Sequence, residues 1–232
     1  ISREISGEEW DSVWVPCRIK GRAGVGVAVR RGRARIDGQP RLVLDDAERD
    51  VDSGRWLEAT VSREGGDTPV RVVSAYFHSG EKDTPKQDAK MAHLPRIGNR
   101  MAELIAEEAN GGVSSLVCGD FNVVRSRSDI KNWTPNHNKR AGVLDEEIAF
   151  LNRWVDEGWR DTVRDLAGNT QGPYSWWSWR GQAFVNNAGW RIDYQYATPR
   201  LGALARSFDI GRAPEYDARF SDHAPVSVTY DI

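Results

Sequence analysis

Ser221-Asp222-His223-Ala224-Pro225-Val226 stands near the end of this 232-residue chain, where a loop leads into a final apolar segment. Neighbouring residues of a strand point to opposite faces of a sheet, so an acid and a histidine that serve one site must lie in the loop before the strand. We expect Asp222 to face a cation and the His223 imidazole to face an acid from elsewhere in the chain. The stretch therefore predicts that candidate catalytic or binding residues lie at the start of a strand.

Two earlier segments each place an aspartate at the edge of a predicted strand. Gly119-Asp120-Phe121-Asn122 follows an apolar run, so the Asp120 carboxylate and the Asn122 amide emerge on the same side of the strand end. The carboxylate suits Mg²⁺ or a base for water, and the amide offers a carbonyl for the metal or an N–H for a phosphate. Taken alone, the segment fits an Asx turn that closes a strand equally well.

Asp193 lies inside Trp190-Arg191-Ile192-Asp193-Tyr194-Gln195, where we predict a strand. A buried carboxylate without a partner is costly, so this residue needs one. Pairing with His223 would hold one imidazole tautomer and raise the imidazole pKa, which suits a ring that faces a negatively charged group. The alternative is a salt bridge from Asp193 to Arg191 or to another basic side chain.

Aromatic residues supply further candidates. Tyr76 ends a β-branched run, where its phenol can donate to a phosphate, act as a base, or simply cap the core. Tyr174-Ser175-Trp176-Trp177-Ser178-Trp179-Arg180 and Trp190 together hold four of the ten tryptophans. Such rings can wall a pocket for a flipped nucleotide or stack on bases, with the arginine on a phosphate. They fit a hydrophobic core equally well.

The totals predict one α/β domain over residues 1–232, because the composition is uniform and the length suffices for a substantial core. A net charge of -2 gives no global basic field, so contacts with phosphate must be local. Two cysteines without metal-ligand spacing fit a reducing compartment. No apolar run reaches the length of a membrane span or signal peptide, so we expect a cytoplasmic protein without membrane contact.

Apolar periodicity predicts six strands and two helices. Pro95 is expected to kink or split the first helix, and Asp145 is expected to cap the second. Gly, Pro and Asn concentrate in the loops 64–69, 126–142 and 166–173. The predicted strands span residues 24–29, 56–61, 70–76, 115–118, 191–197 and 225–230, and the predicted helices span 86–109 and 145–157.

Taken as an ordered set, these motifs resemble the exonuclease III and abasic-site endonuclease branch of the endonuclease/exonuclease/phosphatase family, which also contains DNase I. The resemblance covers nearly the whole chain. It implies a four-layer α/β sandwich, in which helices flank two packed mixed β-sheets. The motifs that carry it are Lys20-Gly21-Arg22-Ala23-Gly24-Val25, Ala75-Tyr76-Phe77-His78-Ser79-Gly80, Gly119-Asp120-Phe121-Asn122, Asp129-Ile130-Lys131-Asn132-Trp133, Gly189-Trp190-Arg191-Ile192-Asp193-Tyr194 and Ser221-Asp222-His223-Ala224-Pro225-Val226.

The resemblance also implies a role for each matching residue. Asp222 would bind Mg²⁺, or Mn²⁺ in its place, with Asp120 and Asn122 as further ligands. His223, oriented by Asp193, would contact the scissile phosphate. Asp120 would orient or deprotonate the attacking water with the help of Asn122, and Tyr76 would stabilise the phosphate.

Within the family, the residues favour DNA repair over lipid or inositol phosphatase work. Trp176, Trp190 and Ile192 stand where the family places the walls of a pocket for a baseless sugar. Lys131 and Asn132 lie in a loop that resembles a contact to the DNA backbone, although a solvated charged loop is the alternative. The implied partner is double-stranded DNA with abasic sites or 3′ ends, and Arg180 is a further candidate for contacting it. We expect a monomer.

The resemblance also indicates what this chain lacks. The family opens with a strand that bears an Asn motif and a second strand whose glutamate binds metal, and the match here begins after that point. We therefore expect an N-terminally truncated sandwich with exposed strand edges and weak metal binding at Asp222. Alternative functions are a nonspecific nuclease, a phosphatase for a small ester, and a remnant that binds nucleic acid without turnover.

Overall fold

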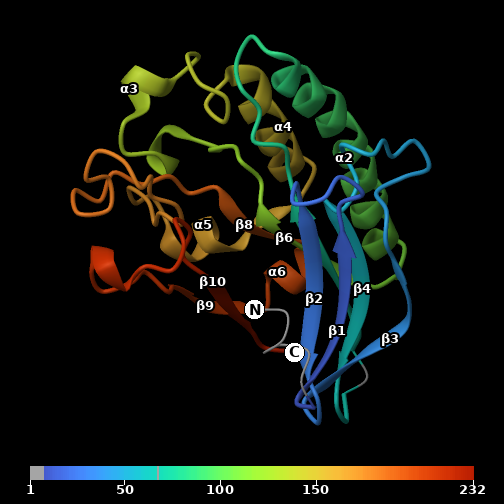
Figure 1. The fold of residues 1–232 in the computed structure, drawn as a ribbon. Coiled ribbons are helices and arrows are strands. Elements are labelled where there is room, and N and C mark those ends of the chain that lie inside the picture. The colour runs from blue at the N-terminus through green and yellow to red at the C-terminus, as the bar shows by residue number, and fades with distance from the viewer. Residues whose placement is uncertain (1–7, 67) are drawn as a thin grey trace.

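The computed structural model describes residues 8–66 and 68–232 (Figure 1). The strands are β1 (Trp10–Pro16), β2 (Gly24–Arg30), β3 (Ala34–Arg41), β4 (Trp56–Arg63), β5 (Val70–Tyr76), β6 (Ser114–Asp120), β7 (Arg160–Asp161), β8 (Asp193–Ala197), β9 (Ala205–Ile210) and β10 (Val226–Tyr230). The helices are α2 (Pro85–Ala109), α3 (Trp133–Asn136), α4 (Asp145–Asp156), α5 (Thr162–Ala167) and α6 (Pro199–Gly202), with 3-10 turns η1 (Arg127–Asp129) and η2 (Tyr216–Ala218).

A six-stranded mixed sheet in the order β3-β4-β5-β6-β8-β7 forms the centre of the fold. β5 and β6 pair in parallel, whereas the other neighbours in this sheet are antiparallel. The register places Tyr76 opposite Asp120, and Asp120 opposite Asp193. Three polar residues singled out in the sequence therefore form one row across the ends of three adjacent strands.

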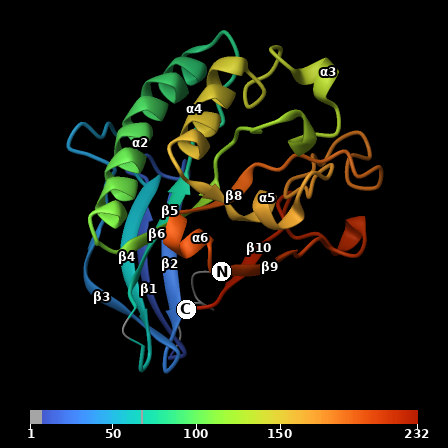
Figure 2. The same cartoon turned by 180° about the vertical axis from the view of Figure 1, so that it is seen from behind.

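Helices α2 and α4 cover one face of this sheet, as the reverse view in Figure 2 shows. The apolar face of α2 carries Leu94, Ile97, Met101 and Leu104, which are all buried in the main core. Pro95 lies inside α2 but does not split the helix, contrary to one of the sequence expectations. In the core on this face, the rings of Phe77, Phe121 and Tyr196 pack edge to face against Trp154 of α4. Tyr194 packs against Phe121 and Tyr196.

The N-terminus of α4 requires a correction. Asp145 is the first residue of the helix, and Leu144 occupies the capping position. The Glu147 carboxylate accepts hydrogen bonds from the backbone N–H groups of Gly142 and Leu144, at 2.6 and 3.3 Å. The buried glutamate therefore fixes the turn that leads into the helix. The N–H groups of Glu147 and Ile148, which an Asp145 cap would serve, donate to the Leu144 carbonyl instead, both at 3.0 Å.

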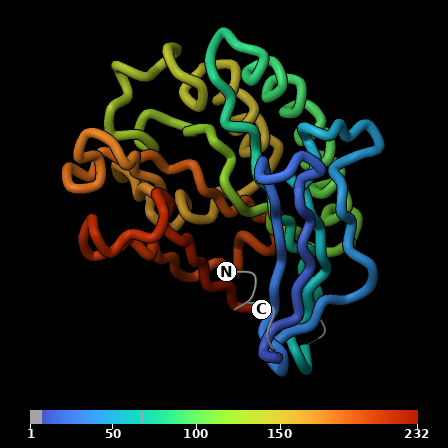
Figure 3. Tube along the Cα trace, viewed as in Figure 1, coloured from blue at the N-terminus to red at the C-terminus, as the bar shows by residue number. Residues whose placement is uncertain are grey.

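The opposite face of the central sheet is covered by two separate antiparallel ribbons, β1–β2 and β9–β10. Val25 and Val27 of β2 pack against Leu57 and Ala59 of β4, which makes a second hydrophobic cluster between the layers. Figure 3 shows the two ribbons apart from each other along the chain trace. Within residues 8–66 and 68–232 no strand joins them, so the second layer is divided where the resemblance implies a continuous sheet.

The α/β sandwich class is confirmed, and so are the six predicted strands, which correspond to β2, β4, β5, β6, β8 and β10. The sequence reading missed β1, β3, β7 and β9. Both cysteines are free. In the described ranges, no helix combines the length and the apolar character that crossing a membrane requires.

Candidate active site

The row of Tyr76, Asp120 and Asp193 depends on a close approach of β5 and β6 just before Asp120. Gly119 has a φ of 140° and its Cα faces the Ala75 carbonyl so closely that a Cβ would collide with that oxygen. Only glycine fits there, because an L side chain would push the two strands apart. The Gly119-Asp120 step therefore sets the carboxylate at the strand end.

His223 reaches this row from the loop before β10. Its Nδ1 lies 2.9 Å from Asp193 Oδ2 and its Nε2 lies 3.9 Å from Asp120 Oδ2. The loop is fixed by two backbone contacts: residue 223 bridges to Trp176, and Ala224 N–H donates to the Ser175 carbonyl at 2.7 Å. One imidazole thus stands between two carboxylates that come from different strands.

The salt bridge considered for Asp193 forms elsewhere. Arg191 is buried and donates to Asp161 Oδ1 and Oδ2, at 2.8 and 2.7 Å, and to Asp129 Oδ1 at 2.7 Å. Because Arg191 lies between Trp190 and Ile192, this network fixes the segment that leads into Asp193. Asp161 and Asp129 therefore neutralise the charge of Arg191 inside the fold. The partner of Asp193 is His223 instead.

Ser175 is a further residue of the site that the sequence reading did not single out. It is fully buried, and its hydroxyl donates to Asp193 Oδ2 at 2.6 Å while it accepts from Asp193 N–H at 3.1 Å. The Asp193 carboxylate is therefore oriented from one side by a serine and from the other by an imidazole. A lone serine between two aromatic residues gives no sequence signal for this role.

The surroundings of the site raise the pKa values of both His223 and Asp120 above their ordinary values. Burial alone would lower the pKa of His223, but the hydrogen bond to Asp193 and the charges of Asp193, Asp120 and Asp222 raise it to about 9. Burial and the charge of Asp193 raise the pKa of Asp120 to about 7. The site therefore holds a cationic imidazole beside a carboxyl group that can exchange a proton near neutral pH.

Asn122 and Lys90 hold the Asp120 carboxylate in place. Asn122 has a φ of 52°, and its N–H and its side-chain amide donate to the two oxygens of Asp120, both at 2.9 Å. This is the Asx turn that the sequence allowed, and it coexists with the acid–histidine arrangement. Lys90 Nζ donates to the Asn122 carbonyl at 2.9 Å and pairs with Glu147 at 2.8 Å, and all three groups are buried or half-buried.

Lys90 was missed, although the sequence held a signal for it. Lys90 lies four residues before Leu94 on the apolar face of α2. This face packs against the core, so the lysine side chain there is not solvated. A charged residue on a buried helical face must have a partner, and Glu147 supplies it.

Tyr76 keeps its phenol proton, so it can donate a hydrogen bond but cannot act as a base near neutral pH. Burial, and next the charge of Asp120, raise the pKa of its phenol. The Arg55 guanidinium lies 4.9 Å from the centre of the Tyr76 ring, and it donates to the Tyr76 carbonyl at 3.3 Å. Arg55 was not expected from the sequence, because nothing in its surroundings along the chain links it to Tyr76.

Asp222 adjoins the row through the aromatic segment, since its Oδ2 accepts from Trp176 Nε1 at 3.0 Å. Burial and next the charge of Asp193 raise the pKa of Asp120, and a bound cation would favour its charged form. Within the described residues, however, neither Asp222 nor Asp120 belongs to a cluster of three closely spaced His, Cys, Asp or Glu ligands. Such a sparse donor set fits Mg²⁺, which is usually held by one or two carboxylates together with water and substrate phosphate.

A cavity of about 700 Å³ opens beside these groups and is lined in part by Asn122, Trp176, Trp190 and Ile192. The two indole rings meet edge to face, with centres 5.5 Å apart. Asn122 lies two residues after Asp120, and Ile192 directly precedes Asp193. Trp176 forms a backbone bridge with His223. The charged residues of the lining are one acid, Glu81, and three bases, Lys82, Lys139 and Arg140.

The remaining candidates for DNA contact lie outside this cavity. Lys131 and Asn132 are exposed and directly follow Ile130, which bridges to Trp190. Arg180 is exposed in the loop after the aromatic segment. The structure thus brings Trp176, Trp190 and Ile192 together and leaves these three polar residues on the surrounding surface.

Comparisons with known proteins agree with this geometry. Over 163 residues the chain is 36% identical to an exodeoxyribonuclease of Bacillus subtilis, covering 70% of this chain and 61% of that protein. Over 127 residues it is 32% identical to a DNA-(apurinic or apyrimidinic site) endonuclease of Dictyostelium discoideum, covering 54% of this chain and 34% of that protein. The chain therefore spans about a third to three fifths of the length of these curated relatives.

Solved structures share the fold. An AP endonuclease from Archaeoglobus fulgidus superposes with a TM-score of 0.77 at 22% identity, covering 97% of this chain and 80% of that one. A 3'-5' exonuclease from Neisseria meningitidis gives 0.76 at 24% identity, covering 100% and 83%. The model of the Endonuclease/Exonuclease/phosphatase family matches residues 4–223. By this match over almost its whole length, and by relatives in the exodeoxyribonuclease III and AP endonuclease branch, the chain belongs to the Endonuclease/Exonuclease/phosphatase family.

Proposed function

We propose that this chain carries the phosphodiesterase site of a DNA-repair nuclease that cleaves 5′ to abasic sites and removes nucleotides from 3′ ends of duplex DNA. The observation that carries the proposal is the His223 imidazole between Asp193 and Asp120, beside a cavity walled by tryptophan. The names of the curated relatives support the choice of DNA as substrate.

The protonation states support distinct roles for the charged groups. His223 stays cationic at neutral pH and can bind the scissile phosphate. Asp120, with a pKa raised to about 7, is poised near the working pH to orient the attacking water or to accept its proton. Tyr76 keeps its proton and can donate a hydrogen bond to a phosphate oxygen. Asp193 and Ser175 act through His223 and are positioning residues.

A divalent cation completes this site in our proposal. Asp222 would hold Mg²⁺, or Mn²⁺, with Asp120 as a further carboxylate ligand, and Asn122 positions Asp120 through its backbone and side-chain N–H donors. When bound, the ion would neutralise negative charge on the phosphate. Without the ion, the protein already holds the His223 imidazole beside the Asp120 carboxylate, and Tyr76 lies opposite Asp120 on the neighbouring strand.

The apolar walls of the cavity support an abasic sugar as the preferred group. Trp176, Trp190 and Ile192 offer apolar surface for a baseless deoxyribose within a lining that is otherwise largely polar. The net charge of -2 means that phosphate contacts must be local, and Lys131, Asn132 and Arg180 supply exposed donors near the cavity. Lys139 and Arg140 add positive charge to the cavity itself.

Incision of a duplex that contains one abasic-site analogue tests the proposal. We expect cleavage with Mg²⁺, none with chelator, and a loss of about 10²- to 10⁴-fold in Asp193→Asn, because His223 loses the charge that orients and protonates it. His137→Gln is the matched control, since His137 forms an exposed pair with Asp145 at 2.6 Å outside the site. Folded wild-type chain that binds the duplex but never cuts it would refute the proposed activity.

Trp190→Ala separates the abasic substrate from other members of the family. We expect it to reduce the preference for an abasic duplex over an intact one, because the variant removes one wall of the cavity. Release of phosphate from small phosphate esters should change little. If selectivity for the abasic site is unaltered in this variant, the cavity does not select the substrate.

A further inference from the structure

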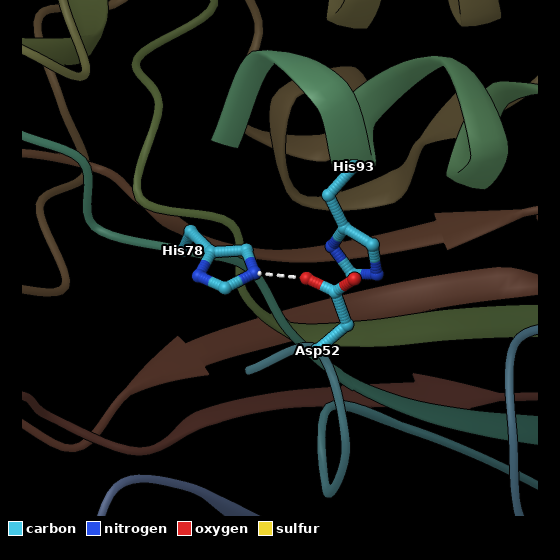
Figure 4. Close-up of side chains that lie close together, drawn as sticks. All are labelled: Asp52, His78 and His93. Atoms are coloured by element: carbon cyan, nitrogen blue, oxygen red, sulfur yellow. Dashed lines mark hydrogen bonds and ion pairs between the residues drawn. The ribbon is translucent and has the colours of Figure 1, made fainter. Parts of the chain in front are cut away.

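A second acid–histidine cluster lies outside the candidate active site. Asp52 comes from the loop between β3 and β4, His78 from the segment after β5, and His93 from α2 (Figure 4). One ligand atom from each of the three side chains lies within 4.8 Å of the other two. The exposed fractions are 1%, 5% and 2%, so the cluster is closed to bulk water.

His93 gives this cluster its most unusual property. Both of its ring nitrogens are buried, and neither has a hydrogen-bond partner among the described residues. A neutral imidazole carries one donor and one acceptor, and leaving them unpaired inside a protein costs free energy. Figure 4 shows the ring beside the Asp52 carboxylate. A group that accepts a nitrogen lone pair at this point would remove part of that cost.

Asp52 is already held in the orientation that a ligand needs. Its Oδ2 accepts from Arg49 Nε and from Arg96, both at 2.9 Å, while its Oδ1 lies 2.9 Å from His78 Nε2. Arg49 also donates from Nη2 to Oδ1 at 3.2 Å, so the arginines anchor both oxygens while Oδ1 faces His78. Hydrogen bonds of this kind behind a ligand fix its orientation and are typical of metal sites.

The protonation states are also those that metal binding requires. Burial lowers the pKa of His78 to about 4 and that of His93 to about 3, so both rings are neutral at physiological pH. Burial opposes ionisation of Asp52, but its partners Arg49 and His78 keep the pKa of the carboxyl below its ordinary range. In the metal-free protein the neutral His78 ring donates its Nε2 proton to Asp52 Oδ1, and metal binding through Nε2 would move this proton to Nδ1. Two imidazoles and one carboxylate then face one another as ligands.

We propose that Asp52, His78 and His93 form a structural binding site for a borderline transition-metal ion of the Zn²⁺ class. Two imidazoles and one carboxylate suit Zn²⁺, whereas Mg²⁺ and Ca²⁺ prefer oxygen ligands throughout. The site shares no residue with the acidic group around Asp222 and Asp120. It differs from the proposed catalytic metal in place, in ligands and in the ion it takes.

Such an ion would join three segments of the fold behind the active site. The loop that carries Asp52 also carries Arg55, whose guanidinium lies over the Tyr76 ring and donates to the carbonyls of Tyr76 and Phe77. His78 follows directly on Phe77. A metal at the cluster would therefore brace the strand end that presents Tyr76, and it would stabilise the fold by linking this end to α2.

Zinc binding to the full chain tests the site. The protein is first stripped with chelator, and Zn²⁺ alone is then titrated in while calorimetry and elemental analysis give affinity and stoichiometry. All proteins carry His223→Gln, which removes the histidine of the active site as a competing ligand. We expect one zinc per chain in this background and in its His137→Gln derivative, and binding weaker by at least about tenfold in the His93→Gln derivative.

Two further measurements keep the test decisive if His93→Gln does not fold. Zinc should raise the unfolding temperature of the His137→Gln derivative but not that of a His78→Gln derivative, because only binding to the native state stabilises it. In the unsubstituted chain, NMR signals of the His78 and His93 rings should shift on addition of one equivalent of zinc, while those of His137 stay in place. Absence of stoichiometric zinc, or a shift confined to His223, would overturn the proposal.

Discussion

Two histidine–aspartate pairs in this molecule have nearly the same contact and opposite chemistry. His78 Nε2 lies 2.9 Å from Asp52 Oδ1, and His223 Nδ1 lies 2.9 Å from Asp193 Oδ2. Yet the pKa of His78 falls to about 4 while that of His223 rises to about 9. The hydrogen bond alone does not decide which imidazole carries the charge.

The surroundings of each pair explain the difference. Burial lowers the pKa of both rings, but next to His78 the charge of Asp52 is shared with Arg49 and Arg96, and the positive charge of Arg55 is close. At His223 burial is the largest single influence, but the hydrogen bond to Asp193 and the charges of the surrounding carboxylates together outweigh it. An aspartate whose charge is already neutralised holds a neutral histidine, and one in an excess of negative charge holds a cation.

Removing the cationic imidazole should have the largest effect on activity. His223→Gln abolishes the only protonated group placed between Asp193 and Asp120, so we expect cleavage of an abasic duplex to fall by about 10²- to 10⁴-fold. His93→Gln, in the neutral cluster, should change the rate per folded molecule by much less. Single-turnover rates on the same duplex measure both, and equal losses in the two variants would contradict the distinction drawn between the pairs.

Asp129 extends the comparison to a carboxylate that is fully neutralised. It is buried, accepts from Arg191 at 2.7 Å and pairs with Arg164 at 2.6 Å. Asp129→Asn removes one of the two carboxylates that neutralise the buried charge of Arg191. We therefore expect the free energy of unfolding to fall by about 3–5 kcal/mol. Asp165→Asn, which breaks the exposed pair with Arg160, should cost at most about 1 kcal/mol. Denaturant unfolding compares the two, and similar costs would show that the buried network is not structural.

The sequence predicted that Asp120, Asp193 and His223 lie together at strand ends, and the structure has them there, while their catalytic roles stay predictions. Asp120, Asp193 and His223 follow or precede short β-branched runs, and strand ends that meet at one edge of a sheet bring such residues together. The register that places Tyr76, Asp120 and Asp193 in line was not predictable, since pairing between distant strands leaves no local pattern.

Other parts of the fold left weaker signals. β3 contains Asp37, Gly38 and Pro40, and β9 is half-exposed, so neither has the apolar alternation that indicates a strand. Asp52, His78 and His93 lie at unrelated spacings on a loop, a strand end and a helix, and only the packing of α2 against that loop joins them. Chemistry assembled by packing alone cannot be predicted from spacing.

The two pairs should give the stability of metal-free protein opposite dependences on pH. The folded pKa of His78, about 4, lies below the ordinary value of 6.5, so its contribution is complete above pH 6.5 and is lost as the pH falls towards 4. The folded pKa of His223, about 9, lies above 6.5, so its contribution is complete below pH 6.5 and is lost as the pH rises towards 9. The titration of each histidine changes the free energy of unfolding by at most about 1.4 kcal/mol per pH unit.

Urea unfolding across this pH range, in chelator, measures both slopes. His78→Gln should flatten the acidic side of the stability profile, and His223→Gln should flatten the alkaline side. Each variant therefore serves as the control for the other. An alkaline slope that survives in His223→Gln would assign that titration to a different group.

The smallest effect comes from altering the charges around the neutral cluster. Burial is the main cause of the lowered pKa of His93, and the charge of Arg96 lowers it further. Arg96→Gln should therefore raise the pKa of His93, by less than about one unit, because burial remains. Arg49→Gln is the matched control: it removes another partner of Asp52, but Arg49 is half exposed and solvent screens its charge. NMR titration of the ring signals in metal-free protein measures both, and a pKa of His93 that is unchanged in Arg96→Gln would mean that burial alone keeps this ring neutral.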